Sequence, residues 1–246
     1  MKEETDLLLF QHLISKNDCD LGLETAALVV AEAEYPGLNL ARYAAKLDRM
    51  GRRARKLVQD SMLEGAPPIV AVLRMLYEDM GFRGNVSDYY DPKNSFLNDV
   101  LDRRLGIPIS LALVIMSVSR RAGVRADGVS FPGHFLVRTE DDHGNLFFVD
   151  PFDGRLLDEE SLQLLYEQTT GDPADLDPAV LQPACRRQIL ARLLNNLRAI
   201  YEVRGDRTRL RRVLQRMAIL NPSDDIESRL ALLGKNAPLT PRLSVN

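Results

Sequence analysis

Residues 104–123, RLGIPISLALVIMSVSRRAG, decide the fold of this chain. Gly106 and Pro108 interrupt the preceding chain, and an almost unbroken apolar run extends from Ile109 to Val118. Such a run indicates a helix that is buried on most of its sides. Gly123 stands where it can end this helix as a C-cap. We therefore predict a central buried helix that other elements of the fold cover.

Three short stretches with β-propensity follow this helix. They are residues 128–131, 134–138 and 145–150, and turn residues separate them at Pro132-Gly133 and at 142–145. One buried helix that leads into an antiparallel meander is typical of an α+β fold. The sequence thus predicts an α+β core over residues 81–171.

Helical patterns flank this core on both sides. Residues 1–80 repeat apolar side chains at helical spacing, which predicts a helical N-terminal layer. After the core we predict a Pro- and Asp-rich linker at 172–185, amphipathic helices at 186–237 and a flexible tail at 238–246. Apolar residues make up 45% and charged residues 27% of the 246, which excludes a disordered chain or a disulfide scaffold.

The cysteine usage and the N-terminus bear on where the protein resides. Cys19 and Cys185 form no CxxC motif, so a reducing compartment fits better than an oxidising one. The N-terminus is acidic where a signal peptide is basic, and no apolar run reaches the roughly 18 residues that span a bilayer. We therefore expect a cytoplasmic protein that does not enter a membrane.

Few side chains are available for chemistry, because the chain has three histidines, two cysteines and no tryptophan. Cys19 and Cys185 are predicted to be small buried hydrophobic residues. His12 is predicted to be structural and His143 to lie in an exposed turn. His134 and His143 lack the HExxH or HxH spacing of metal ligands, so we predict no metal site and no cofactor.

Four ordered blocks carry a family resemblance: NSFLN at 94–98, RLGIPISL at 104–111, PGHFLVR at 132–138 and VDPF at 149–152. Together they resemble the signature blocks of the SirB-type transglutaminase-like family, whose mostly uncharacterised members are bacterial. The resemblance implies a papain-like core with a buried helix and an antiparallel sheet. It also implies a C-terminal tetratricopeptide segment, in the order expected here.

The joint between the two C-terminal helices, Gly205-Asp206, resembles the tetratricopeptide repeat in one consistent register. The residues that carry this likeness are Leu197, Tyr201, Leu214, Leu220 and Pro222. A single repeat does not stand alone, because stacked neighbours supply its core. We therefore expect these helices to pack on the preceding domain, with a peptide-binding groove as the alternative.

Active members of the superfamily use a Cys at the N-terminus of the buried helix, a His on the next strand and an Asp on the strand after it. A helix N-terminus lowers the thiol pKa, the imidazole takes the proton and the carboxylate orients the imidazole. The resemblance places His134 and Asp150 in the second and third positions. His134 bonded to Asp150 could equally be a core histidine that holds two strands together.

The nucleophile position can be located by spacing. The superfamily has a small residue four positions after its Cys, a basic residue twelve after and a Gly fifteen after. Ala112, Arg120 and Gly123 fit this spacing when it is counted from Pro108. Pro108 cannot attack an acyl group, and Ser110 lies roughly 200° further around the helix. The sequence therefore argues against a thiol enzyme.

Our first hypothesis is a non-catalytic interaction or regulatory protein whose degenerate acyl-transfer cleft binds a peptide or protein partner. The candidate cleft residues are Asn94, Asn98, Ser110, His134 and Asp150. The two asparagines could instead cap helices or tie a loop. The alternative function is an amide-bond hydrolase or transferase in which His134 activates water and Asp150 orients the His134 ring.

A third hypothesis rests on the uneven distribution of charge. Residues 1–35 contain eight acidic residues and two lysines, whereas residues 186–216 contain ten arginines and two acidic residues. The basic surface is predicted at Arg207, Arg209, Arg211, Arg212 and Arg216. It is either a solvated face, a partner of the acidic N-terminal helices, or a site for RNA or an acidic protein. No aromatic residues interleave with these arginines, which disfavours stacking on single strands.

Overall fold

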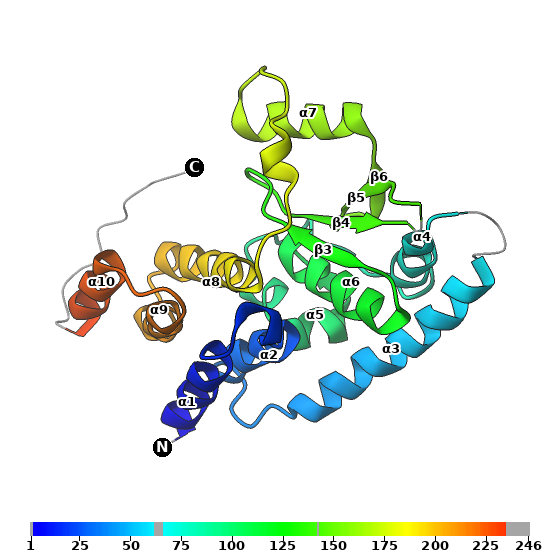
Figure 1. Cartoon of the computed structure of the whole chain (residues 1–246). Helices are drawn as coiled ribbons and strands as arrows, with labels where there is room; N and C mark the ends of the chain where they lie inside the picture. The colour runs from blue at the N-terminus through cyan, green and yellow to red at the C-terminus, as the bar shows by residue number, and fades with distance from the viewer. Residues whose placement is uncertain (1, 62–65, 142, 235–246) are drawn as a thin grey trace.

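The central helix predicted from the apolar run is present in the computed structural model, which describes residues 2–61, 66–141 and 143–234. It is α6 (Pro108–Ala122), with almost every side chain buried, and Gly123 ends it with a φ of 86° as predicted. On one side it packs against α3 (Leu40–Ser61), and on the other against a sheet (Figure 1). The α+β fold is confirmed.

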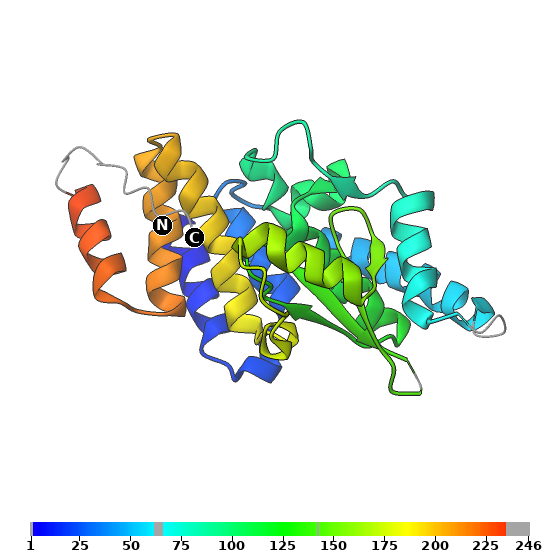
Figure 2. The same cartoon turned by 90° about the horizontal axis from the view of Figure 1, so that it is seen from above.

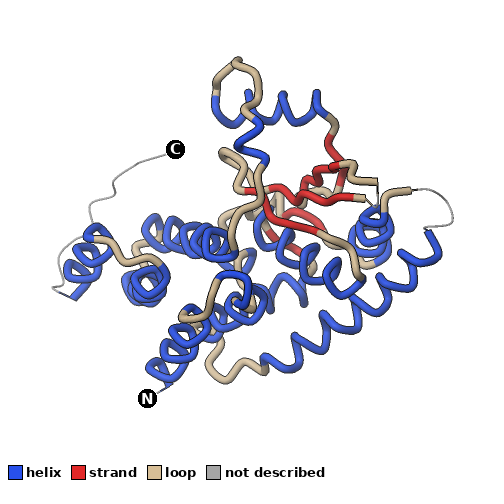
Figure 3. The backbone as a smooth tube through the Cα atoms, viewed as in Figure 1, coloured by secondary structure: helices blue, strands red, loops and turns tan. Residues whose placement is uncertain are grey.

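The sheet has four antiparallel strands in the order β3-β4-β5-β6. The first three, β3 (Ala126–Val129), β4 (Leu136–Glu140) and β5 (Leu146–Asp150), occupy the predicted stretches within a few residues. The fourth, β6 (Arg155–Leu157), was not predicted, because three residues after a turn carry no detectable alternation. Figure 3 shows the strands gathered together within a largely helical molecule.

Side-chain alternation divides the sheet into two faces. Val137 and Val149 are directly paired and face the helical core that contains α6. Leu136 and Phe148 face a second, smaller apolar cluster. Helix α7 (Glu159–Thr170) covers this second face, to which it contributes Leu162.

The N-terminal region is helical, as predicted. Its elements are α1 (Lys2–Ile14), η1 (Asp18–Asp20), α2 (Leu23–Glu32), α3, α4 (Pro68–Leu73) and the π-helical segment η3 (Arg74–Asp79). Between this region and α6 lie a two-stranded parallel pair and two short helices. They are β1 (Arg83–Gly84), η4 (Pro92–Asn94), α5 (Leu97–Arg103) and β2 (Leu105–Gly106).

The C-terminal helices lie at one end of the molecule (Figure 2). They are α8 (Arg186–Val203), α9 (Arg207–Leu220) and α10 (Asp224–Gly234), and α1 packs against α9. One continuous cluster of buried apolar side chains includes residues of every helix from α1 to α10 except α7. The predicted N-terminal, central and C-terminal regions therefore share a core, as expected of helices that cannot stand alone.

The predicted linker is attached to the sheet. Ala184 N–H donates to the carbonyl oxygen of Gly128 at 2.8 Å, and Pro183 forms a β-bridge with Val129. The short helix η5 (Pro178–Leu181) lies within this segment, and Val180 and Leu181 pack against the apolar cluster beneath α7. Residues 172–185 thus cover the sheet rather than spanning free space. The predicted tail at 238–246 lies outside the described residues.

Within the described ranges, no helix combines the length and the apolar character needed to cross a membrane.

Candidate functional site

The structure brings His134 and Asp150 into direct contact. His134 lies in the loop between β3 and β4, and Asp150 is the last residue of β5. His134 Nε2 lies 2.9 Å from Asp150 Oδ1, with side chains 17% and 8% exposed. Phe152 N–H donates to the same carboxylate oxygen at 2.8 Å. The pair therefore joins β5 to the start of β4 and keeps both side chains in a fixed orientation.

The ionisation of Asp150 follows from these contacts. Burial acts to raise the pKa of its carboxyl, but the hydrogen bonds from His134 and Phe152 outweigh burial and hold that pKa below its usual value. An ionised carboxylate accepts hydrogen bonds only, so Nε2 carries the proton in this contact. Nδ1 is then the ring nitrogen left for other chemistry, and no described residue forms a hydrogen bond with it.

The N-terminus of α6 carries no nucleophile. Pro108 is the first residue of the helix, a position that suits proline because its missing N–H needs no partner there. Ser110 is fully buried, and its Oγ accepts from Ile107 N–H at 3.1 Å and donates to the carbonyl oxygen of Asn94. Ser110 thus caps the helix and ties it to the preceding loop.

Both cysteines are exposed, so the prediction that they are buried is wrong. Cys19 lies between two aspartates in η1, and Cys185 is the N-cap of α8. Polar connecting segments of this kind run over the surface and bury little side chain. His12 is exposed near the end of α1, not packed in the core, and His143 lies in an exposed turn as predicted.

The described residues contain no cluster of three or more His, Cys, Asp or Glu side chains that could hold a metal ion. The contact of His134 with Asp150 is an acid–base pair.

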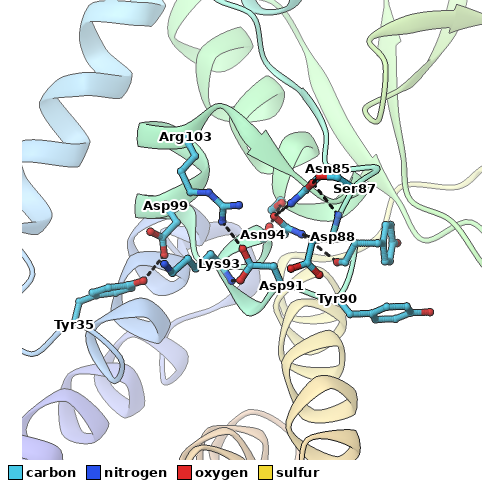
Figure 4. A network of polar contacts seen from close by, with 12 residues as sticks. Tyr35, Asn85, Ser87, Asp88, Tyr90, Asp91, Lys93, Asn94, Asp99 and Arg103 are labelled. Atoms are coloured by element: carbon cyan, nitrogen blue, oxygen red, sulfur yellow. Dashed lines mark hydrogen bonds and ion pairs between the residues drawn. The ribbon is translucent and has the colours of Figure 1, made fainter.

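A polar network fixes the loop of residues 85–94, which precedes α5 (Figure 4). Asn94 is fully buried, and its Nδ2 donates to the carbonyl oxygens of Asp88 and Tyr89 at 2.7 and 3.1 Å. Its Oδ1 accepts from Asn85 Nδ2 at 3.0 Å. These contacts match the loop-tying alternative for Asn94. Asn98 is also buried, in the first turn of α5, and its Oδ1 has no hydrogen-bond partner.

Two further contacts strengthen this network (Figure 4). Arg103 Nη1 lies 2.9 Å from Asp91 Oδ2, which joins the end of α5 to the loop. The Tyr35 hydroxyl donates to Asp99 Oδ2 at 2.7 Å, which joins the loop after α2 to α5. Side chains therefore hold the 85–94 loop at both ends, in addition to the short helix η4 within it.

This fixed loop exposes apolar side chains, one of which contacts the turn that follows Asp150. Val86, Tyr89 and Tyr90 are 81%, 43% and 71% exposed. The Tyr89 ring lies 6.2 Å from the ring of Phe152, which follows Asp150 by two residues. We call Val86, Tyr89, Tyr90 and Phe152 the aromatic rim. Sequence reasoning missed it, although the Tyr89-Tyr90 pair next to the NSFLN block was a usable signal.

An arginine from the C-terminal helices also reaches this region. Arg192, on α8, donates from Nη1 to the carbonyl oxygen of Phe131 at 2.9 Å, and its guanidinium lies 5.7 Å from the Phe135 ring centroid. Phe131 and Phe135 bracket His134 in the sequence. The sequence alone did not distinguish Arg192 from the other arginines of residues 186–216.

The predicted basic surface is for the most part an internal contact. Arg209 pairs with Glu34 at 2.6 Å, and Arg212 donates to the carbonyl oxygen of Ala33 at 3.0 Å. Arg207 donates to the carbonyl oxygen of Leu233 at 3.2 Å.

Arg216 is only 3% exposed, so its placement on the outer face was wrong. Its Nη2 lies 2.6 Å from Asp6 Oδ2, because α1 covers this side of α9. Arg211 is exposed. The acidic N-terminal helices are thus the partner of most of these arginines, one of the alternatives left open.

Comparison with known proteins identifies the family of this arrangement. The model of the transglutaminase-like superfamily matches residues 41–195, from α3 into α8. The chain belongs to this superfamily. The match extends on both sides of residues 81–171, so the superfamily domain includes α3 and α4 as well as the predicted core. The transglutaminase-like part of the resemblance is confirmed, and the tetratricopeptide-like part stays a prediction.

Curated relatives place the chain more narrowly, in the UPF0162 family. A UPF0162 protein of Xylella fastidiosa strain Temecula1 is 42% identical over 205 residues, 82% of this chain and 72% of the relative. One from strain 9a5c is 40% identical over 227 residues, 91% and 80% of the two chains. F-box only protein 21 of Mus musculus is 46% identical over 68 residues, 28% of this chain and 11% of that protein. No solved structure matches the chain.

The state of Asp150 leads to a testable pH dependence. The pKa of Asp150 is lower in the folded protein than in the unfolded chain. The ionised carboxylate therefore stabilises the fold at a pH above the unfolded-state pKa of about 3.9. This stabilisation is lost as the pH falls through the folded-state pKa. We expect Asp150→Asn to destabilise the protein by about 1 kcal/mol at pH 5, where a charged hydrogen bond becomes a neutral one. The difference between wild type and Asp150→Asn should shrink by pH 3 in urea unfolding followed by circular dichroism. A difference that stays constant from pH 5 to pH 3 would contradict the assignment.

Proposed function

We propose that this protein is a non-catalytic binding protein that uses its transglutaminase-like core to hold a peptide segment of a partner. The observation that carries the proposal is Pro108 at the start of α6, while His134 and Asp150 remain in contact. A thiol enzyme needs a nucleophile at the helix N-terminus, where the dipole stabilises the thiolate. Without that nucleophile, the acyl-transfer chemistry of the fold has no first step.

The other residues near the helix N-terminus do not replace the missing thiol. The Ser110 hydroxyl is buried and already bonded to Asn94 and Ile107, so it is not available to attack a substrate. His134 still offers Nδ1, which keeps water activation by this residue as the alternative function. That alternative predicts hydrolysis that depends on His134.

The aromatic rim supplies a surface for binding. Tyrosine side chains in a fixed loop provide large contact area at small cost in conformational entropy, which is why they dominate binding hot spots. Tyr89 and Tyr90 belong to such a loop, because Asn94 and Arg103 hold it. The rim lies next to Asp150 through the contact of Tyr89 with Phe152. A peptide laid across this region would contact both the rim and the His134 side chain.

The remaining parts of the proposal concern the setting. We place the protein in the cytoplasm, where its two free, exposed cysteines would stay reduced. The three C-terminal helices act as a tetratricopeptide-like unit that buttresses the core, since they share its buried apolar cluster.

A peptide titration tests binding. The probe is a degenerate acetylated hexapeptide library with free carboxyl termini, and the readout is the backbone amide shifts of residues 86–90 and 152 in 1H–15N NMR spectra. We expect saturable shifts that weaken about tenfold in Tyr89→Ala, because a buried aromatic contact contributes about 1–2 kcal/mol. Leu146→Ala is the matched control, because Leu146 is 48% exposed at the other end of β5. Equal affinity of Tyr89→Ala and wild type would contradict the rim as the binding surface.

A separate assay tests catalysis. The protein is incubated with casein and a fluorescent primary amine, and with a glutamine-containing peptide whose release of ammonia is measured. We expect no product above the protein-free baseline. Product formed by wild type and lost in His134→Ala would replace this proposal by the hydrolase or transferase alternative.

A further inference from the structure

Arg192 is a half-buried arginine whose charge the fold leaves unpaired. Several partly buried arginines of the described residues have a carboxylate partner, as Arg121 has in Glu24 and Asp48. Arg192 has no carboxylate within ion-pair distance among the described residues. Its protein partners are the carbonyl oxygen of Phe131 and the face of the Phe135 ring. A guanidinium has five N–H donors, so most of its hydrogen-bonding capacity remains open.

The unused N–H groups of Arg192 are not fully buried. They are not among the fully buried polar atoms that lack a partner, so they keep some exposure to solvent. Burial lowers the pKa of the guanidinium, and Tyr89 is the group whose charge opposes that effect. Arginine nevertheless stays protonated at any ordinary pH. The result is a permanent, partly desolvated positive charge, a costly arrangement unless an anion completes it.

Three acidic groups at this end of the sheet already have partners. Asp150 is bonded to His134 and to Phe152 N–H. Asp153 pairs with Arg155 at 3.1 Å, and Asp91 pairs with Arg103. None of these three carboxylates is paired with Arg192. A ligand carboxylate would supply the charge that complements this guanidinium.

From the contacts of Arg192 with Phe131 and Phe135 we propose that its guanidinium binds a carboxylate group of the bound peptide, either its C-terminus or an aspartate or glutamate side chain. The planar guanidinium matches a carboxylate through two parallel hydrogen bonds. This inference rests on the proposed peptide binding and adds the chemical class that the site selects. The carboxylate would lie beside the loop that carries His134, since Phe131 and Phe135 hold the guanidinium there.

Three hexapeptide libraries test the inference, all acetylated at the N-terminus. The first ends in a free carboxylate and lacks Asp and Glu, the second is amidated and contains Asp and Glu, and the third is amidated and lacks both. Binding is followed by the amide shifts of residues 86–90 and 152. We expect the first or the second library to bind at least tenfold more tightly than the third, and the difference between those two identifies the source of the carboxylate.

Substitutions then assign the effect to Arg192. In Arg192→Gln the preference for carboxylate-bearing libraries should disappear. Arg192→Lys keeps the positive charge but loses the planar guanidinium that forms two parallel hydrogen bonds, so this variant should retain part of the preference. Arg198→Gln is the matched control on the same helix, because Arg198 already pairs with Glu202. Circular dichroism of each variant establishes that it is folded.

The outcomes separate the two claims. Equal binding of all three libraries, or an unchanged preference in Arg192→Gln, would overturn the carboxylate site while peptide binding still held. The absence of amide shifts with every library would instead overturn the proposed function, and the carboxylate site with it.

Discussion

Replacing Arg216 by leucine is expected to destabilise the protein by about 3–5 kcal/mol, since removing one partner leaves the other charge buried and uncompensated. Arg216 on α9 and Asp6 on α1 have side chains only 3% and 10% exposed, and Nη2 and Oδ2 lie 2.6 Å apart. In Arg216→Leu the Asp6 carboxylate must either stay desolvated, take up a proton, or leave the core together with α1. Each of these lowers the free energy of unfolding, which urea titration at pH 7 measures.

Two further variants test whether the destabilisation comes from the unpaired Asp6 carboxylate. The double variant Asp6→Leu/Arg216→Leu should recover most of the loss, because apolar replacement of a whole buried pair is often neutral or stabilising. Arg211→Leu is the matched control on the same helix, and because Arg211 is exposed it should change stability by no more than about 0.5 kcal/mol. A single variant that costs less than about 1 kcal/mol, or a double variant as unstable as the single one, would show that the ion pair does not hold α1 on α9.

Arg216 also shows where sequence reasoning reaches its limit. The apolar stripe of α9 is complete without this residue, so its charge indicated the outer face. Its neighbours Val213 and Leu220 are buried, and Arg216 lies close to them on the helix surface. Whether such a boundary position is buried depends on a carboxylate 210 residues away in the sequence. The charge imbalance between the two ends of the chain indicated that they meet, but it could not select the pair.

The central helix and the His134–Asp150 pair were accessible from the sequence for different reasons. The apolar run from Ile109 to Val118 contains two serines and no charged residue, so burial is the environment that suits it. His134 and Asp150 could be placed because their blocks keep the order of the family motifs. Both predictions depend on features that the sequence itself contains: the composition of one segment, and the order of motifs along the chain.

The aromatic rim and Arg192 carry no such local signal. The contact of Tyr89 with Phe152 joins a loop to the end of β5, and Arg192 reaches the His134 loop from α8. These contacts depend on how the C-terminal helices and the two-residue strands β1 and β2 pack, and elements that short have no periodicity to detect. A site formed by tertiary packing of this kind is visible only in three dimensions.

The second large effect is expected at Gly154, the residue that ends the turn between β5 and β6. It has a φ of 77°, a conformation that costs an L-residue about 1–2 kcal/mol. A Cβ at this position would also lie 2.5 Å from the ring of Tyr77, a half-buried side chain whose hydroxyl donates to the carbonyl oxygen of Pro151. Overpacking of this type adds about 1–3 kcal/mol. Gly154→Ala should therefore destabilise the protein by about 2–5 kcal/mol in urea unfolding.

Gly144→Ala separates the two contributions. Gly144 has a similar φ of 83°, but a Cβ there would have Glu140 Oε1 as its nearest neighbour, at 3.9 Å, so this variant carries the backbone strain without the clash. The amount by which Gly154→Ala lowers the free energy of unfolding more than Gly144→Ala does then measures the steric clash with the Tyr77 ring. A double-mutant cycle with Tyr77→Ala should give a coupling of about 1–3 kcal/mol, because removal of the ring relieves the contact. If both glycine variants lower the free energy of unfolding equally and show no coupling to Tyr77, the turn moves freely. Asp150 and Phe152 would then lack the rigid support that the binding site requires.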